Sequence, residues 1–193
     1  MREITEVVET PSDQELMLAV RGGDIAQLGI LFERRHVQLF NFLLRMTGSR
    51  SMSEDLVQEV FVRLLKYRHT YRAESEFTTW MFSIARNARI DYLRKSPRDT
   101  VSVESEGHEA ASEVPSSADL MLRDEESRLL WQAVSRLPEE KREVLLLRGV
   151  HGMKFEEIAE ALNCPINTVK GRAFRAIRAL RAMIRQPAAE GIQ

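Results

Sequence analysis

The chain has 193 residues and a formal net charge of −1, with 44% hydrophobic and 30% charged residues. This length allows one domain, or two small ones, with a hydrophobic core. No apolar run approaches the roughly 20 residues that a membrane span needs, and the acidic N-terminus lacks the apolar core of a signal peptide. Cys164 is the only cysteine. Intrachain disulfides and cysteine-rich zinc sites are therefore excluded, and we expect a cytoplasmic protein.

The small net charge hides a strong segregation of charge along the chain. Residues 99–126 hold nine acids and one base, whereas residues 164–185 hold six bases and no acid. Residues 77–98 hold five bases and one acid. Two basic segments therefore flank an acidic one, and this local pattern determines the electrostatics more than the overall charge does.

Apolar residues at helical spacing predict four helices in the first half of the chain. The first opens with the capping-box pattern of Ser12 and Glu15, and Ser53 is expected to cap the third. The four helices are expected at about 12–21, 25–46, 53–65 and 77–94, with a polar loop at 71–76.

The second half begins with residues 98–118, which lack helical periodicity and are rich in Ser, Glu, Ala and Pro, a composition typical of a linker. Further helices are expected at about 119–136, 138–148, 155–162 and 166–185. No stretch alternates with period two for long enough to propose a strand. We therefore predict an all-α chain with two small helical domains, at 12–97 and 119–185, joined by a flexible acidic linker at 98–118.

The last two predicted helices form a helix-turn-helix pattern. Residues 155–162 give a short amphipathic helix, Asn163 to Pro165 break it, and residues 166–185 give a longer basic helix. Asn163 suits the left-handed residue of the turn, a conformation that asparagine tolerates better than most residues. Such an arrangement fits the major groove of DNA. An apolar stripe of the longer helix should pack on the preceding helices, while a basic face points away from them. The stripe comprises Val169, Ala173, Ile177, Leu180 and Ile184, and the basic face with its flanks comprises Lys170, Gly171, Arg172, Phe174, Arg175 and Arg178.

This basic face has the chemistry for reading DNA. Arginine and lysine donate to guanine O6 and N7, and Phe174 can contact a thymine methyl group. Gly171 would let the backbone approach the base edges closely. The plainer alternative is a solvated charged face without a ligand. The short helix, the turn, the apolar stripe and the missing acids together favour DNA contact.

Three segments of the chain stand out as motifs: Ser53–Leu65 reads SEDLVQEVFVRLL, Phe77–Lys95 reads FTTWMFSIARNARIDYLRK, and Leu137–Leu147 reads LPEEKREVLLL. The first resembles the RNA polymerase-binding helix of the extracytoplasmic-function (ECF) sigma factors, a group of the sigma-70 family. The second resembles that group's promoter-melting helix. The third, with residues 156–159 and 168–172, resembles its C-terminal domain. Together they span most of the chain, in the order that the family has.

The resemblance implies a sigma-2-like domain at residues 12–97 and a sigma-4-like helix-turn-helix domain at residues 119–185. It implies a sigma factor that directs core RNA polymerase to specific promoters, recognises their −35 and −10 elements and promotes strand opening. The implied partners are bacterial core polymerase, through its β′ clamp helices and β flap, promoter DNA and an anti-sigma factor. We expect no cofactor, no metal, no membrane insertion and no enzymatic activity.

The resemblance also assigns roles to individual residues. The loop at 71–76 would hold a base flipped from the non-template strand, and Asn87 matches a position that contacts an extruded base. Trp80 has two interpretations, core packing or base stacking, and its apolar neighbours favour the core. Asp55 and Glu59, with Gln58, would meet a basic partner surface; the plainer alternative is that Glu54 and Asp55 only cap their helix, and both can be true. The expected contacts are Asp55, Leu56, Gln58, Glu59 and Phe61 with core polymerase; Tyr71, Arg72, Arg86, Asn87, Arg89 and Arg94 with the −10 element; and Lys170, Gly171, Arg172, Phe174, Arg175 and Arg178 with the −35 element.

Two other classes of protein are alternatives. One is a transcription regulator that binds duplex DNA without polymerase and uses its N-terminal domain as a sensor or dimerisation module. The other is an enzyme, which the scattered His36, His69, His108 and His151 disfavour because they show no metal-binding spacing. Two interpretations of residues 98–118 also stay open. They either thread the polymerase toward its RNA exit path or form a solvated spacer that its charge keeps off DNA.

Overall fold

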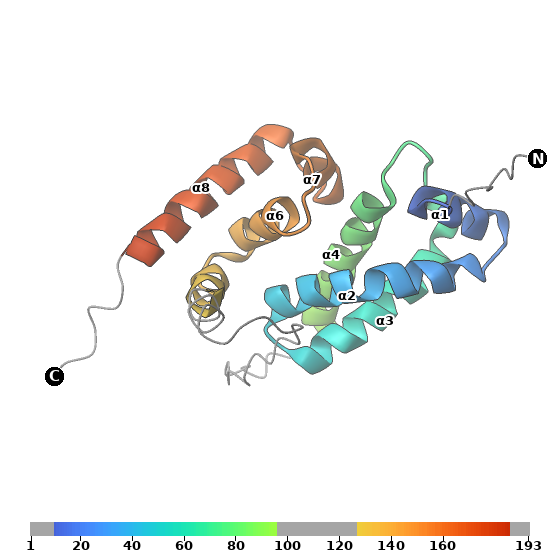
Figure 1. The fold of residues 1–193 in the computed structure, drawn as a ribbon, viewed down its shortest axis with the longest axis horizontal. Coiled ribbons are helices and arrows are strands. Elements are labelled where there is room, and N and C mark those ends of the chain that lie inside the picture. The colour runs from blue at the N-terminus through green and yellow to red at the C-terminus, as the bar shows by residue number, and fades with distance from the viewer. Residues whose placement is uncertain (1–9, 96–126, 186–193) are drawn as a thin grey trace, which may run out of the picture.

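The structure is a computed structural model that describes residues 10–95 and 127–185. Within these ranges every regular element is a helix and no strand occurs, so the all-α prediction is confirmed. Helices α1 to α4 form a first domain, and a helix at 127–135 with α6 to α8 forms a second (Figure 1). The elements are α1 (Asp13–Gly22), α2 (Gln27–Thr47), α3 (Arg50–Lys66), the 3-10 turn η1 (Arg68–Thr70), α4 (Phe77–Lys95), α6 (Glu139–Gly149), α7 (Phe155–Ala161) and α8 (Ile166–Arg185).

Some predictions fall on residues that the structure does not describe. The predicted linker at 98–118 and the start of the helix expected at 119–136 lie outside the described residues. None of the described helices is both long enough and apolar enough to cross a membrane.

The first helix begins where the sequence predicts. Ser12 has extended backbone angles and its hydroxyl accepts a hydrogen bond from the Glu15 amide at 3.3 Å, while the Glu15 carboxylate accepts from the Ser12 amide at 2.7 Å. The two residues therefore form a complete capping box. Hydrogen bonds donated to the Glu15 carboxylate by the Ser12 amide and hydroxyl hold the pKa of Glu15 below its ordinary value. Gly23, with a φ of 113°, ends the helix in the left-handed conformation that glycine adopts without strain.

The third helix begins earlier than predicted, and the prediction that Ser53 caps it is wrong. Ser49 is the cap, and its hydroxyl accepts from the Met52 amide at 3.3 Å. Ser53 lies buried one turn later and donates to the Ser49 carbonyl at 2.6 Å. Gly48, at a φ of 73°, ends α2 and places Ser49 directly in the cap position. Several serines in this segment satisfy the cap pattern, and the end of the preceding helix selects among them.

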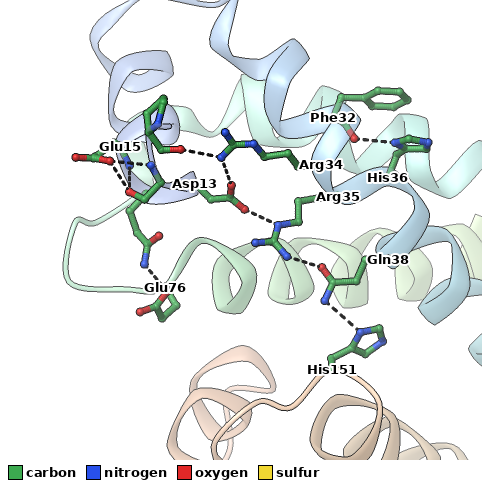
Figure 2. Close-up of polar contacts among 12 residues, drawn as sticks. Asp13, Glu15, Phe32, Arg34, Arg35, His36, Gln38, Glu76 and His151 are labelled. Carbon is green, nitrogen blue, oxygen red and sulfur yellow. Dashed lines mark hydrogen bonds and ion pairs between the residues drawn. The ribbon is translucent and has the colours of Figure 1, made fainter. Parts of the chain in front are cut away.

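A buried ion cluster fastens α1 to α2 (Figure 2). The Asp13 carboxylate is 7% exposed. It accepts from Arg34 Nη1 at 3.1 Å and pairs with Arg35 Nε on its other oxygen. Both arginines keep about a third of their surface in solvent. The cluster therefore compensates a buried carboxylate with two cations, which ties the two helices together.

Aromatic side chains fill the core of the first domain. The rings of Phe42 and Phe82 meet edge to face with their centroids 5.0 Å apart. Tyr71 is fully buried against Phe77 and Trp80, at centroid distances of 6.4 and 5.1 Å. Phe77 and Phe82 belong to the core as predicted, and Trp80 packs against it half-buried. The aromatic residues near the start of α4 thus hold this helix against α2 and the loop before it.

The second domain packs α8 on α6 and α7, but the predicted apolar stripe of α8 is partly wrong. Val169 and Ala173 are buried as expected, and Ala176 is buried in place of Ile177. Ile177 and Ile184 are 43% and 53% exposed. Val169, Ala173 and Ala176 follow the 4–3 spacing of one helix face, so the buried face of α8 runs through Ala176 and leaves Ile177 outside it.

Candidate nucleic-acid interface

The helix-turn-helix geometry follows from the turn at residues 163–165. Asn163 adopts a φ of 48°, the left-handed conformation expected for it. The Cys164 amide donates to the Ala159 carbonyl at 3.0 Å and so closes the turn behind α7. Val169 and Ala173 then fasten α8 against the rest of the domain. The opposite side of α8 is left facing solvent.

This outward side of α8 holds most of the residues predicted to read the −35 element. Lys170, Phe174, Arg175 and Arg178 are exposed, with Phe174 at 67%. None of the ion pairs in the described part of the chain involves these three cations, so their charge is available to a ligand. An exposed phenylalanine among cations that pair with none of the described acids is a mixture suited to contacts with DNA bases and phosphates.

Gly171 and Arg172 behave differently from their neighbours. A Cβ added at Gly171 would lie 3.3 Å from Arg175 Nη1, because the Arg175 guanidinium folds back over the glycine. Arg172 turns toward α6 and pairs with Glu140 at 2.9 Å. The structure therefore places Arg172 at the side of the basic face, where it braces α8.

The residues predicted for the −10 element separate into two groups. Arg72, Asn87 and Arg94 are exposed. Tyr71, by contrast, is buried, and its hydroxyl donates to the Ser75 carbonyl at 2.9 Å. Burial raises the pKa of Tyr71 to about 12. Tyr71 therefore shapes the loop from within, and in this conformation it does not line an open base pocket as predicted.

Arg89 on α4 is covered by the second domain and Arg86 is partly covered by it, which the sequence did not lead us to expect. Arg89 is 2% exposed and pairs with Glu139 on α6. Arg86 Nε lies 3.5 Å from the carboxylate of Glu143, which is itself buried. The pairing with Arg89 lowers the pKa of Glu139, whereas burial raises the pKa of Glu143. These contacts join residues about fifty positions apart and leave no local signal in the sequence.

His151 of the second domain contacts the first domain at the same place and faces Gln38 of α2 (Figure 2). Its ring lies 4.8 Å from the Phe82 ring and 5.8 Å from the Phe42 ring. Gln38 Nε2 faces His151 Nδ1 at 3.3 Å, and Gln38 Oε1 accepts from Arg35 Nη1 at 3.0 Å. Because Arg35 fixes the amide oxygen, Gln38 offers only its N–H to the histidine. Nδ1 must therefore accept, and the contact requires the neutral ring.

Lowering the pH from about 7.5 to about 5.5 is expected to weaken the contact between the domains by up to about tenfold. Burial and the nearby Arg45 lower the pKa of His151 to about 4, against its ordinary 6.5. When the domains are apart, His151 therefore takes up a proton at a higher pH than it does inside the contact. The stability of the contact, present above pH 6.5, is lost as the pH falls toward 4. Because the His151 ring is partly accessible to solvent, the contact weakens by less than the full pKa difference would give. The radius of gyration by small-angle X-ray scattering is the measurement.

A His151→Gln variant is the control, because it removes this titration. Of the charged groups on the elements around the ring, Arg45 on α2 acts directly on the pKa of His151, and Arg35 on α2 reaches the ring through Gln38. Arg86 on α4 and Glu143 on α6 pair with each other across the same contact. The raised pKa of Glu143 acts with the opposite sign, since its protonation relieves a buried charge as the pH falls. Both proteins keep Glu143, so their difference isolates the histidine. A pH response equal in the two proteins would contradict the prediction.

The acidic side of α3 is the second exposed surface with a strong charge. Asp55, Gln58 and Glu59 are exposed, whereas Leu56 and Phe61 are buried. The prediction that Leu56 and Phe61 contact polymerase therefore needs correction in this conformation. Both lie on the inner side of the helix and support its outer face from behind.

Arg63 organises this surface and was missed by sequence reasoning. Its guanidinium pairs with Glu59 at 2.6 Å and with Asp91 of α4 at 2.7 Å. The hydrogen bond from Arg63 holds the pKa of Asp91 below its ordinary value. A helical spacing of four between Glu59 and Arg63 is the signal that was available in the sequence. The ion pair between Arg63 and Asp91 joins two helices, so it could be identified only from the fold.

The fold and the exposed basic helix define a two-domain DNA-binding protein, and comparison with known sequences gives its family. Residues 31–98 match Sigma-70 region 2, and residues 127–180 match Sigma-70, region 4. The chain is 31% identical to the RNA polymerase sigma-H factor of Pseudomonas aeruginosa, over 87% of this chain and 91% of that protein. It is 32% identical to the ECF RNA polymerase sigma-E factor of Escherichia coli K12, over 89% and 94%. The chain therefore belongs to the ECF sigma factors of the sigma-70 family.

Solved structures share the fold. The structure of CnrH in complex with the cytosolic domain of CnrY gives a TM-score of 0.68 at 23% identity, covering 91% of this chain and 99% of that one. The sigma factor RpoE in complex with the anti-sigma factor NepR from Bartonella quintana gives 0.62 at 23% identity, covering 83% and 98%. The all-helical two-domain architecture is thus that of known sigma factors.

Proposed function

We propose that this protein is a dissociable initiation subunit of bacterial RNA polymerase. It directs the core enzyme to specific promoters through their −35 and −10 elements and promotes strand opening. The observation that supports this most is one chain with two sigma-70 domains, the first bearing the exposed acidic side of α3 and the second the exposed basic side of α8. The protein acts in the cytoplasm and performs no bond chemistry of its own.

In this proposal α3 docks on the β′ clamp helices of core polymerase, and the second domain engages the β flap. Asp55, Gln58 and Glu59 would meet a basic partner surface, while Leu56 and Phe61 hold the helix in place from the core. Exposed charge pairs of this kind steer association and set register more than they add affinity. An anti-sigma factor that covers these surfaces completes the set of proposed partners.

Promoter recognition is divided between the domains. Lys170, Gly171, Phe174 and Arg175 would read the −35 element in the major groove. On the first domain, Arg72, Asn87 and Arg94 are open to the −10 strand and Arg86 is partly open, whereas the buried Arg89 reaches it only after the second domain moves away. Those arginines would then bind phosphates of the single strand.

The decisive experiment combines the protein with bacterial core polymerase and a randomised promoter library. Transcripts that start from a recurring pair of elements support a sigma factor. DNA binding that is strong without polymerase and unchanged by it would instead favour the free-standing regulator. Failure to co-migrate with core polymerase at low salt would contradict the proposal outright.

Arg175→Ala is expected to weaken promoter use by about 1–3 kcal/mol in a sequence-dependent way, because a bidentate base contact is lost. The measurement is transcription from selected promoters and from variants with one changed −35 base pair. Arg181→Ala is the matched control, since Arg181 is an exposed cation on the same helix outside the predicted set. An equal loss on all promoters would reassign Arg175 to a phosphate contact.

A further inference from the structure

Helix α1 holds both ends of the loop at residues 71–76. It packs against η1 and α4, the two elements that flank this loop. At the first end, Arg21 Nη1 donates to the Tyr71 carbonyl at 2.8 Å. At the last end, Gln14 Nε2 donates to the Glu76 carboxylate (Figure 2). The two donors are seven residues apart on α1, which is about two helical turns, so they lie on one face of the helix.

The loop also has hydrogen bonds of its own, which connect its ends to its tip. The Tyr71 hydroxyl donates to the Ser75 carbonyl at 2.9 Å, and the Ser75 amide donates to the Arg72 carbonyl at 3.2 Å. Arg72, Ala73 and Glu74 at the tip are exposed. Because the internal bonds tie the tip to the first residue of the loop, the position of that residue determines where the exposed side chains lie.

Helix α1 is a firm support for these contacts. Leu16, Met17 and Val20 on its inner side are 2% exposed or less, and the capping box and Gly23 define its two ends. Both contacts with the loop join elements of the first domain, so they do not depend on where the second domain lies. The two donors are outside the set predicted to contact DNA, and they come before residue 31, where the match to Sigma-70 region 2 begins.

We propose that Arg21 and Gln14 are positioning residues, which set the −10 sequence preference of the loop at 71–76 without touching DNA. The inference rests on the proposed function, in which Arg72 of this loop is open to the −10 strand. Extruding a base from the stack costs free energy, and a loop that already has its binding shape offsets this cost better than one that must order itself. A loop with fixed ends also discriminates between bases, because it does not remodel around each of them.

The first measurement is transcription by core polymerase with the full chain, from a promoter library randomised at the −10 element. In Arg21→Ala, the ratio between the most used and the second most used base at the most selective position is expected to fall by about fivefold, the equivalent of one net hydrogen bond. The −35 preference is expected to stay that of the parent. Arg21→Lys keeps a donor for the Tyr71 carbonyl and is expected to restore most of the ratio.

Gln14→Glu tests the other end of the loop. The substitution is nearly isosteric, and it places a carboxylate opposite that of Glu76 in place of an N–H donor. An acid in the first turn of a helix is stabilising, so α1 itself is not weakened. We expect the −10 preference to change in the same direction as in Arg21→Ala. Arg50→Ala is the matched control, because Arg50 is an exposed arginine that pairs with Glu54 within α3, and its preference should equal that of the parent.

The fluorescence of Trp80 gives a second measurement that needs neither polymerase nor DNA. The Tyr71 ring lies 5.1 Å from the Trp80 ring, so a released loop exposes the indole to water. In the full chain with Trp131→Phe, Arg21→Ala is expected to shift the emission to longer wavelength and to increase quenching by acrylamide, and Arg21→Lys to do so much less. Unchanged emission overturns the inference, and so does an unchanged −10 preference or a loss that is equal on all −10 sequences. A parent protein that selects no −10 element removes the proposed function, and the inference with it, whatever the emission shows.

Discussion

Phe42→Ala is expected to lower the free energy of unfolding of the first domain by about 3–5 kcal/mol. Phe42 is 1% exposed, and its ring contacts both Phe82 and His151. Truncation removes buried apolar surface and leaves a cavity where α2, α4 and the second domain meet. The rings around it are held by other contacts and do not collapse into the space, so the cost lies well above that of an ordinary surface change.

The measurement is urea denaturation followed by tryptophan fluorescence. Each domain contains one tryptophan, Trp80 in the first and Trp131 in the second, so a Trp131→Phe background makes the signal specific to the first domain. Val37→Ala on the same helix is the control, because Val37 is 56% exposed and should cost less than about 0.5 kcal/mol. A loss below about 1 kcal/mol for Phe42→Ala would contradict the described core.

Asp13→Ala should destabilise the first domain by about 3 kcal/mol. The carboxylate is buried and accepts from both Arg34 and Arg35, so its removal leaves two cations facing each other without compensation. Their partial exposure lets water recover some of the loss, which places the expected value at the lower end for a broken buried pair. The same fluorescence assay in the Trp131→Phe background measures it.

Asp24→Ala is the matched control. Asp24 is an exposed acid whose carboxylate accepts from Gln27 at 2.8 Å, a contact on the surface beside α2. We expect a change within about 0.5 kcal/mol. If the two substitutions cost the same, the Asp13 cluster contributes nothing beyond an ordinary surface contact.

The sequence predicted the elements well where local rules decide them. The capping box at Ser12 and the left-handed Asn163 depend on neighbours within four residues, and both appear as expected. The cap at Ser53 failed because the serine at position 49 satisfies the same rule and the end of α2 decides between them. Ile177 is exposed because the buried face runs through Val169, Ala173 and Ala176, a 4–3 spacing that fits a helix as well as the predicted stripe does, so periodicity alone could not choose between them.

Only part of the candidate site could be predicted, because contacts between the domains leave no local signal in the sequence. The amino-acid composition of residues 166–185 was enough to predict the exposed basic helix α8. The fate of Arg86 and Arg89 depends on acids about fifty residues further along the chain, and His151 looked isolated. Contacts between domains are set by shape and charge that come together only after each domain has folded. The polymerase and promoter roles of the individual residues stay predictions.

Arg63 has a consequence for how the two faces of the first domain respond to each other. Its single guanidinium serves Glu59 on α3 and Asp91 on α4 at once. Any cation arriving beside Glu59 competes with Arg63 for that carboxylate, and a guanidinium released from it turns its full charge toward Asp91. Weakening one ion pair of this bridge thereby strengthens the other. Arg63 therefore couples the charge on the outer side of α3 to that of the neighbouring helix through a single side chain.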